Sequence, residues 1–201
     1  MAREVRKGMG KGAIYPHEKA KLLLHPVRRI LQSPSRLADR LELSPGMLLL
    51  EVGPGPGWFS VEIARRLEPG PGPLLFDIQR EMLRMATERL DRAGLSAPAV
   101  QGDAMALPFR DQSFDVALFV TVLGEVPDPA LCLTEVWRVL KNGGLLYVSE
   151  ARGDPDRIRY SRLREMTEGA GFIAEPGHPG RGWVYTAKFH KPDGSAPAGP
   201  G

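Results

Sequence analysis

The sequence predicts an α/β fold, a mostly parallel, doubly wound sheet with helices on both faces. Three observations predict it. Short apolar runs typical of buried strands alternate with segments of helical periodicity between residues 48 and 171. A glycine-rich turn joins the first run to the helix behind it, and single acidic residues mark the ends of several runs. Parallel strands joined by right-handed helical crossovers produce this alternation, and ligands bind beyond the carboxyl ends of such strands.

A helix over residues 34–43 is predicted to come before the first strand. Ser33 and Pro34 are typical of a helix start, because serine accepts a hydrogen bond from an N–H of the first turn and proline needs no such partner there. The turn Ser44-Pro45-Gly46 then leads the chain into the sheet.

The first strand, residues 48–52, and the turn behind it are central to the functional prediction. The turn carries Gly53, Gly55 and Gly57, which tolerate backbone angles closed to other residues and let a ligand lie against bare main chain. A helix is predicted next, because apolar residues recur at every fourth position, at Phe59, Ile63 and Leu67. Its N–H groups and positive dipole end would face the ligand.

Pro54 and Pro56 narrow the class of ligand. Proline carries no N–H, so the turn lacks two donors that a pyrophosphate would use. This favours a cofactor without phosphates. S-adenosylmethionine (SAM) fits, since it offers a carboxylate, an amine, a sulfonium, a ribose and an adenine. A tight turn with no ligand is the alternative.

Strands and helices continue to alternate after this turn. Strands are predicted at residues 74–78, 99–101, 114–120 and 145–149, with 114–120 the central one, and helices at 80–93 and 129–141, the second with Leu133, Val136, Trp137 and Leu140 facing the core. Asp154-Pro155 predicts another helix, ending near Gly171. A terminal β-hairpin is expected from residues 172–175 and 183–189, followed by a flexible tail at 191–201.

Asp77 closes the second predicted strand, twenty residues after Gly57. A carboxylate at this place can accept both hydroxyls of a ribose. Its neighbour Ile78 is then placed to lie against an adenine face. The alternative is that Asp77 caps the helix that follows, and both roles are compatible.

Two further acids end strands. Glu51 can fix the glycine turn or attract the ammonium group of the cofactor, unless it is simply solvated. Asp103 can accept the exocyclic amine of adenine, with the Ala104 N–H as donor to a ring nitrogen, although a turn aspartate is an equal reading.

The end of the fourth strand is expected to meet the reacting part of the cofactor. Backbone at Val120 and Thr121 should lie beneath the methionine portion of SAM. Glu125 follows at the rim, where it can act as a general base or steer an acceptor, or can be an exposed acid that leads into a helix.

In combination these motifs resemble the class I SAM-dependent methyltransferases, of the methyltransferase type 11 and ubiquinone/menaquinone-biosynthesis kind. The resemblance runs from Leu48 to Glu150. It rests on Glu51-Val-Gly-Pro-Gly-Pro-Gly57, Asp77, Gly102-Asp-Ala-Met-Ala-Leu-Pro-Phe109, Ser113-Phe-Asp115, Val126-Pro-Asp-Pro129 and Arg138-Val-Leu-Lys-Asn-Gly-Gly144. It implies a Rossmann-like seven-stranded sheet with an antiparallel C-terminal hairpin, SAM as methyl donor, and a small-molecule or lipid-like acceptor. Family members often carry a His-His pair where this chain has Gly124-Glu125.

The N-terminal arm is the predicted cover of the site, because the connection after the fifth strand is too short for a large lid. We divide the chain into this arm (1–35), a SAM-binding domain (36–190) and the tail. A short helix is expected near residues 17–25 of the arm. Tyr15, His17 and His25 are its predicted contacts to the substrate, each with an ordinary surface or packing role as the alternative.

The arm is also basic. Residues 1–40 hold ten Lys or Arg against three acids, a balance of +7, and the whole chain carries +3, so the remainder carries −4. Such an arm suits nucleic acid, anionic lipid or an acidic substrate, or is a solvated face. Methylation of RNA or protein is therefore one alternative function. A SAM-binding protein without turnover, serving as regulator or scaffold, is another.

Composition excludes several other classes of protein. Cys132 is the single cysteine, so the chain has no internal disulfide and no multi-thiol chemistry. No His/Cys cluster has metal-ligand spacing and no hydrolase nucleophile motif is present. No apolar run approaches the roughly 20 residues that cross a bilayer, and the basic start leads into glycines, so we expect the cytoplasm.

Overall fold

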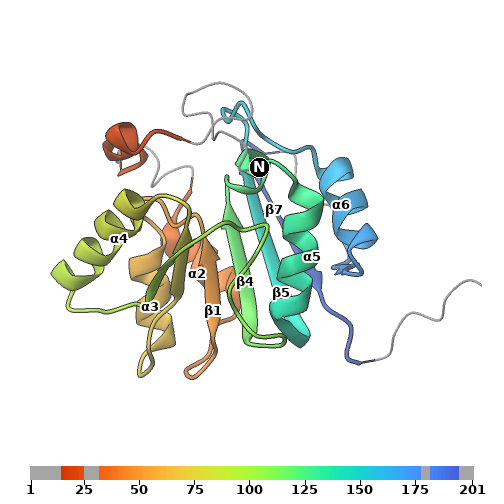
Figure 1. The fold of residues 1–201 in the computed structure, drawn as a ribbon, viewed down its shortest axis with the longest axis horizontal. Helices are drawn as coiled ribbons and strands as arrows, with labels where there is room; N and C mark the ends of the chain where they lie inside the picture. The colour runs from red at the N-terminus through yellow and green to blue at the C-terminus, as the bar shows by residue number, and fades with distance from the viewer. Residues whose placement is uncertain (1–14, 25–31, 178–181, 195–201) are drawn as a thin grey trace, which may run out of the picture.

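In the computed structural model, residues 15–24, 32–177 and 182–194 are described, and they form an α/β fold around a seven-stranded sheet (Figure 1). The strand order is β3-β2-β1-β4-β5-β7-β6. Neighbours from β3 to β5 run parallel, whereas β7 is antiparallel to both β5 and β6. The predicted fold class, with its antiparallel C-terminal hairpin, is confirmed.

The elements have the following bounds. The strands are β1 Leu49–Val52, β2 Leu74–Asp77, β3 Ala99–Gln101, β4 Phe114–Val120, β5 Leu140–Ala151, β6 Ile173–Ala174 and β7 Val184–His190; the α-helices are α2 Pro34–Leu41, α3 Ser60–Leu67, α4 Arg80–Arg92, α5 Pro129–Val139 and α6 Tyr160–Gly169; the 3₁₀-helices are η1 His17–Leu24 and η2 Leu123–Glu125.

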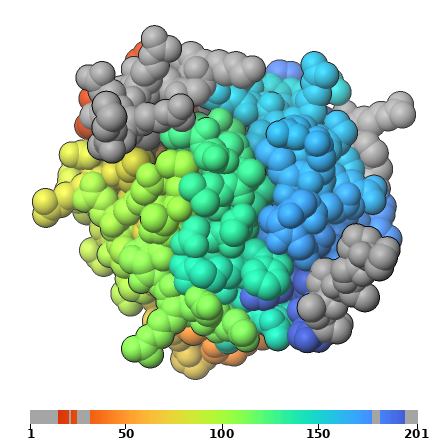
Figure 2. Space-filling model, turned by 45° about the vertical axis from the view of Figure 1, so that its right-hand side comes forward, coloured from red at the N-terminus to blue at the C-terminus, as the bar shows by residue number. Residues whose placement is uncertain are grey.

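Helices cover both faces of the sheet (Figure 1). Successive strand residues point to opposite faces, so Leu49 packs with the apolar residues of α2 and α3, whereas Leu50 packs with those of α5 and α6. Helix α4 packs against Leu75 on the α3 side. In the space-filling view, α5 and α6 form one continuous surface over their face (Figure 2). The inner strands are thus buried on both sides, as their unbroken apolar runs predict.

The element boundaries that differ most from the prediction are those of α6, α5 and β5, the last of which runs over Leu140–Ala151 and not 145–149. Helix α6 begins at Tyr160, not after Asp154, because the Asp154 carboxylate accepts a hydrogen bond from the Asp156 N–H (2.8 Å) and closes a turn. The preceding helix, α5, ends at Val139, and Leu140 already pairs with Phe114. An aspartate before proline is compatible with a capped helix or with such a turn, and sequence does not separate the two.

The C-terminal part of the sheet is fastened to α5. Lys191, although within the predicted tail, is only 3% exposed, and its Nζ donates hydrogen bonds to the carbonyls of Trp137 and Leu140 (both 2.8 Å). Its ammonium also lies 3.9 Å from the centre of the Trp137 ring. Trp137 therefore supports the end of α5 from a half-exposed position, outside the core for which it was predicted. Residues 195–201 of the predicted tail lie outside the described residues.

Candidate functional site

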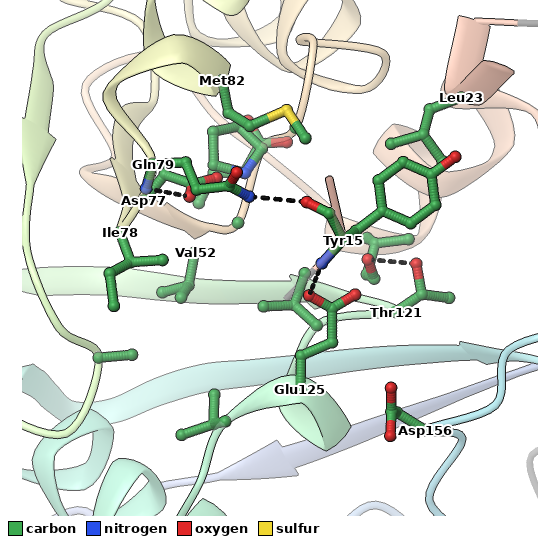
Figure 3. A pocket seen from close by; sticks show the side chains of 18 of the residues that line it. Tyr15, Leu23, Val52, Asp77, Ile78, Gln79, Met82, Thr121, Glu125 and Asp156 are labelled. Atoms are coloured by element: carbon green, nitrogen blue, oxygen red, sulfur yellow. Dashed lines mark hydrogen bonds between the residues drawn. The ribbon is translucent and has the colours of Figure 1, made fainter. Parts of the chain in front are cut away.

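A cavity of about 370 Å³ opens at the carboxyl ends of β1, β2 and β4 (Figure 3). Strand β1 lies between β2 and β4, so the connections from β1 and from β4 leave toward opposite faces of the sheet and a crevice opens between them. The wall includes the turns after these strands, the residues that directly follow β3, and the N-terminal segment.

The glycine-rich turn contributes backbone to this wall. Gly53, Gly55 and Gly57 all have positive φ (66°, 55° and 76°), a region that other residues rarely adopt. Gly53 and Gly55 line the cavity. Gly57 does not, and a Cβ at that position would lie 2.9 Å from Cα of Ala86 in α4. The third glycine therefore serves the packing of α4 against the turn.

Glu51 is a buried carboxyl in the wall, only 3% exposed. Burial raises its pKa to about 7, against a smaller opposing effect of the nearby Ser60 side chain. The Ser60 hydroxyl is outside ordinary hydrogen-bond geometry, and Oε2 of Glu51 has no hydrogen-bond partner among the described residues. A buried orphan oxygen of this kind suits a cationic ligand group that pairs with it.

Asp77 and Ile78 line the next part of the wall, at the end of β2. Oδ1 of Asp77 accepts the Gln79 N–H at 2.8 Å, which orients the carboxylate toward the cavity (Figure 3). Burial raises the Asp77 pKa to about 6, and the nearby backbone N–H groups of Gln79, Ile78 and Gly55 limit the rise. Asp77 thus faces the cavity, as a ribose contact requires, and its hydrogen bond fixes the backbone of Gln79, the residue that precedes the first turn of α4.

Asp103 repeats this arrangement at the end of β3. Its Oδ1 accepts the Met105 N–H at 2.9 Å, and both Asp103 and Ala104 line the cavity. The same turn, with a carboxylate that accepts from the residue two positions on, therefore follows both β2 and β3. The predicted ribose and adenine contacts lie on neighbouring strands.

The end of β4 places Val120 and Thr121 in the wall. Thr121 has φ of 54°, unusual for a β-branched residue, and its hydroxyl donates to the Val120 carbonyl at 2.7 Å. Gly53 lies against this strand end, since a Cβ there would be 2.5 Å from a methyl group of Val122. The left-handed residue turns the chain away from the sheet and brings η2 to the rim.

Glu125 ends η2 and faces the cavity (Figure 3). Its Oε2 accepts the backbone N–H of Tyr15 at 3.2 Å. Burial raises the Glu125 pKa to about 7, and the charges of Asp154, Asp156 and Asp77 raise it further against that hydrogen bond. A carboxyl that titrates near neutral pH is suited to proton transfer.

The three predicted substrate contacts of the arm differ in placement. Tyr15 lines the cavity, together with Leu23 of η1. His17 is not in the wall, and its Nε2 lies 3.6 Å from the Glu18 carboxylate. His25 lies outside the described residues. The wall also includes residues that sequence did not single out, namely Trp58, Gln79, Met82, Asp154 and Asp156.

The chemistry of the cavity wall fits SAM. Glu51, Asp77, Asp103 and Glu125 line it, and among the described residues of the wall there is no lysine, arginine or histidine. Apolar side chains such as Ile78 and Met82 line the cavity together with Asp77 and can enclose an adenine. A cationic nucleoside therefore meets complementary carboxyl groups, whereas a pyrophosphate meets no basic side chain among the described residues of the wall.

Two other kinds of site are absent from the described part of the chain. No group of three or more His, Cys, Asp or Glu side chains there has the arrangement of a metal site. Nor does any helix in the described ranges have the length and hydropathy to span a bilayer.

Comparison with known proteins also points to a methyltransferase. Residues 50–148 match the family described as "Methyltransferase domain". The chain is 38% identical over 111 residues to the ubiquinone/menaquinone biosynthesis C-methyltransferase UbiE of Bordetella avium, covering 55% of this chain and 43% of that protein. It is 36% identical over 132 residues to an uncharacterized 37.1 kDa protein in transposon TN4556 of Streptomyces fradiae, covering 64% and 37%. The chain thus spans less than half the length of these curated relatives.

A solved structure shares the fold. The chain superposes on a SAM-dependent methyltransferase from Aquifex aeolicus with a TM-score of 0.80 at 20% identity, over 88% of this chain and 98% of that one.

Proposed function

Because residues 50–148 of this chain belong to the methyltransferase domain family, within the class I SAM-dependent methyltransferases, we propose that the protein transfers a methyl group from SAM to a small-molecule or lipid-like acceptor. One observation carries the proposal: a glycine turn whose two prolines offer no N–H to a phosphate faces the same cavity as the Asp77 carboxylate. This cavity would then hold both the cofactor and the acceptor.

Different residues of the wall would contact different parts of the cofactor. Asp77 would accept the ribose hydroxyls, Ile78 would contact the adenine face, and Asp103 with the Ala104 N–H would take the adenine edge. Glu51 would pair its orphan Oε2 with the ammonium group, while Gly53, Gly55 and the backbone of Val120 and Thr121 would support the methionine portion. When bound, SAM supplies a methyl group already activated by a sulfonium.

What the protein adds to such a reaction is position and a dry site. Glu125 stands at the rim with a pKa of about 7, so it can accept a proton from an acceptor that carries an O–H or N–H. Tyr15 and Leu23 close the wall from the N-terminal side. The arm would thereby exclude water and select the acceptor.

A small acceptor is favoured over RNA by the charge of the cavity. Six carboxyl groups line it, those of Glu51, Asp77, Asp103, Glu125, Asp154 and Asp156, and no basic side chain does among the described residues. A phosphate backbone would be repelled there. The name of the UbiE relative, a C-methyltransferase of quinone biosynthesis, is consistent with a small or lipid-like acceptor.

The experiment has two parts. SAM or its demethylated product S-adenosylhomocysteine (SAH), at about 100 times its dissociation constant, should raise the free energy of unfolding by about 2.7 kcal/mol. Incubation of the protein with methyl-labelled SAM and a host extract, followed by mass spectrometry, should then show a labelled small molecule. Label in RNA or protein would replace the proposed acceptor class, saturable SAH binding without label would indicate a non-catalytic SAM-binding protein, and no binding would refute the proposal.

A further inference from the structure

Gln79 and Glu125 hold one residue of the N-terminal segment over the mouth of the cavity (Figure 3). We propose that they are positioning residues that fasten residues 15–24 as a strap across the site, and that the strap sets how long a bound nucleoside stays. The identity of the nucleoside rests on the proposed function; the strap itself does not.

Both polar backbone groups of Tyr15 are used by this fastening. Its N–H donates to Oε2 of Glu125 at 3.2 Å, and its carbonyl accepts from Nε2 of Gln79 at 2.9 Å. Glu125 follows β4 and Gln79 follows β2, on either side of β1. Tyr15 therefore bridges the crevice at the point where a ligand would enter.

The rest of the strap lies over the cofactor side of the site. Helix η1 packs against α4, at the end of the sheet where the cavity opens (Figure 1). Leu23 lines the cavity, and its Cδ1 lies 3.7 Å from the position of a Cβ built on Gly55. Residues 15–24 thus roof both the glycine turn and the rim, so a nucleoside beneath them leaves only when the strap lifts.

Gln79 connects the strap to the cofactor position. Its backbone N–H donates to Asp77, and its side-chain Nε2 must be the atom that faces the Tyr15 carbonyl, because only the amide nitrogen can donate. The amide oxygen Oε1 is then buried without a hydrogen-bond partner among the described residues. A ligand hydroxyl or N–H that donates to Oε1 would satisfy it, and occupancy would favour the closed strap through the same side chain.

The test measures closure directly and does not depend on turnover. Hydrogen–deuterium exchange of the peptide covering residues 15–24 is followed with and without SAH, and SAH dissociation is timed by stopped flow. Gln79→Ala and Glu125→Ala each remove one fastening bond, and we expect exchange of this peptide to rise and SAH to dissociate about fivefold to tenfold faster. Melting temperatures identify any variant that fails to fold.

Two further variants serve as matched controls. Glu125→Gln keeps an oxygen that can accept the Tyr15 N–H, so it should restore protection and slow dissociation. Gln101→Ala removes a glutamine whose Nε2 donates to the Ile78 carbonyl at 3.0 Å outside the wall, and it should change neither readout.

Unchanged exchange and dissociation in both alanine variants would overturn the strap. So would Glu125→Gln behaving like Glu125→Ala, because a fastening role requires rescue by the amide. Hydrogen–deuterium exchange of the ligand-free protein tests the strap even if SAH does not bind. A failure of SAH to bind would count against the proposed function and not against the strap.

Discussion

The two halves of the cavity are built in different ways. One, the cofactor half, follows β1, β2 and β3 and comprises Glu51, Gly53, Gly55, Asp77, Ile78, Asp103 and Ala104. The other, the rim half, comprises Tyr15, Leu23, Glu125, Asp154 and Asp156. In the cofactor half, Asp77 and Asp103 are each oriented by a residue two positions on, whereas Tyr15 meets Glu125 across 110 positions. Local turns preform the first half, and tertiary contacts assemble the second.

The largest effect should come from breaking the cofactor half alone. Asp77→Ala removes a carboxylate that would accept two ribose hydroxyls, and charge-assisted hydrogen bonds are each worth about 1.5–3 kcal/mol. We expect SAH affinity to fall by at least 100-fold in isothermal titration calorimetry. Asp77→Asn keeps one acceptor oxygen, so its SAH affinity should lie between those of Asp77→Ala and the wild type. Wild-type affinity in the alanine variant would remove Asp77 from ribose binding.

The buried carboxyl of Glu51 in the cofactor half predicts how the stability of the fold changes with pH. Burial raises the Glu51 pKa from 4.5 to about 7, so the folded state holds this proton more tightly than the unfolded chain does. The resulting stability is present below pH 4.5 and is lost as pH rises through 7, which amounts to about 3 kcal/mol for this carboxyl.

Glu51→Gln should flatten that decline when ligand-free protein is unfolded in urea at pH 5 and pH 8. The remaining slope reports the other carboxyls whose pKa burial raises, namely Asp77 to about 6, Glu125 to about 7 and Glu150 to about 8. An unchanged slope in Glu51→Gln would mean that Glu51 is ionised in the folded protein at pH 5.

The glycine turn allows folding and binding to be separated within the cofactor half. Gly57→Ala combines a positive φ with a Cβ 2.9 Å from the backbone of Ala86, so we expect a loss of about 2–3 kcal/mol in urea unfolding. Gly55→Ala has the positive φ but only Leu23 at 3.7 Å, so about 1 kcal/mol is expected together with weaker SAH binding. Equal losses in both variants would contradict the packing role of Gly57.

The rim half is tested by the same carboxyl that fastens Tyr15. Glu125→Gln cannot accept a proton, and if Glu125 is the base for an O–H or N–H acceptor, kcat should fall about 30-fold, or about 2 kcal/mol, with SAH affinity unchanged. The measurement needs the acceptor identified by labelled SAM. Full activity in this variant would leave Glu125 with the fastening role alone.

The contrast between the halves also explains what the sequence could predict. Asp77 and Asp103 were found because a strand end followed by a turn is a local pattern, and the chain itself places these residues at the sheet edge. Glu125 was found for the same reason. Its contact with Tyr15 was not, because nothing within the sequence near either residue specifies a partner 110 positions away.

Other omissions have similar causes. Gln79 precedes a helix, and a glutamine at such a position is not recognisable from the sequence as a functional residue. Its role follows only from the hydrogen bond that it donates to the Tyr15 carbonyl in the structure. Asp156 was placed in a helix that begins four residues later, at Tyr160, because an aspartate before a proline is typical of a helix start as well as of the turn found here.

The smallest effect should come from an apolar contact in the cofactor half. Ile78 lines the cavity and is 37% exposed in the ligand-free protein, so an adenine stacked on it would cover the remaining surface. Ile78→Ala leaves the Asp77 turn and its backbone hydrogen bonds intact. It removes three carbons, and covering the part of them that is now exposed is worth about 1 kcal/mol. We expect SAH to bind about fivefold more weakly, with ribose recognition unaffected. An SAH analogue without the adenine, S-ribosylhomocysteine, should bind Ile78→Ala and the wild type equally. A fivefold difference with that ligand would place the adenine elsewhere and Ile78 against another part of the cofactor.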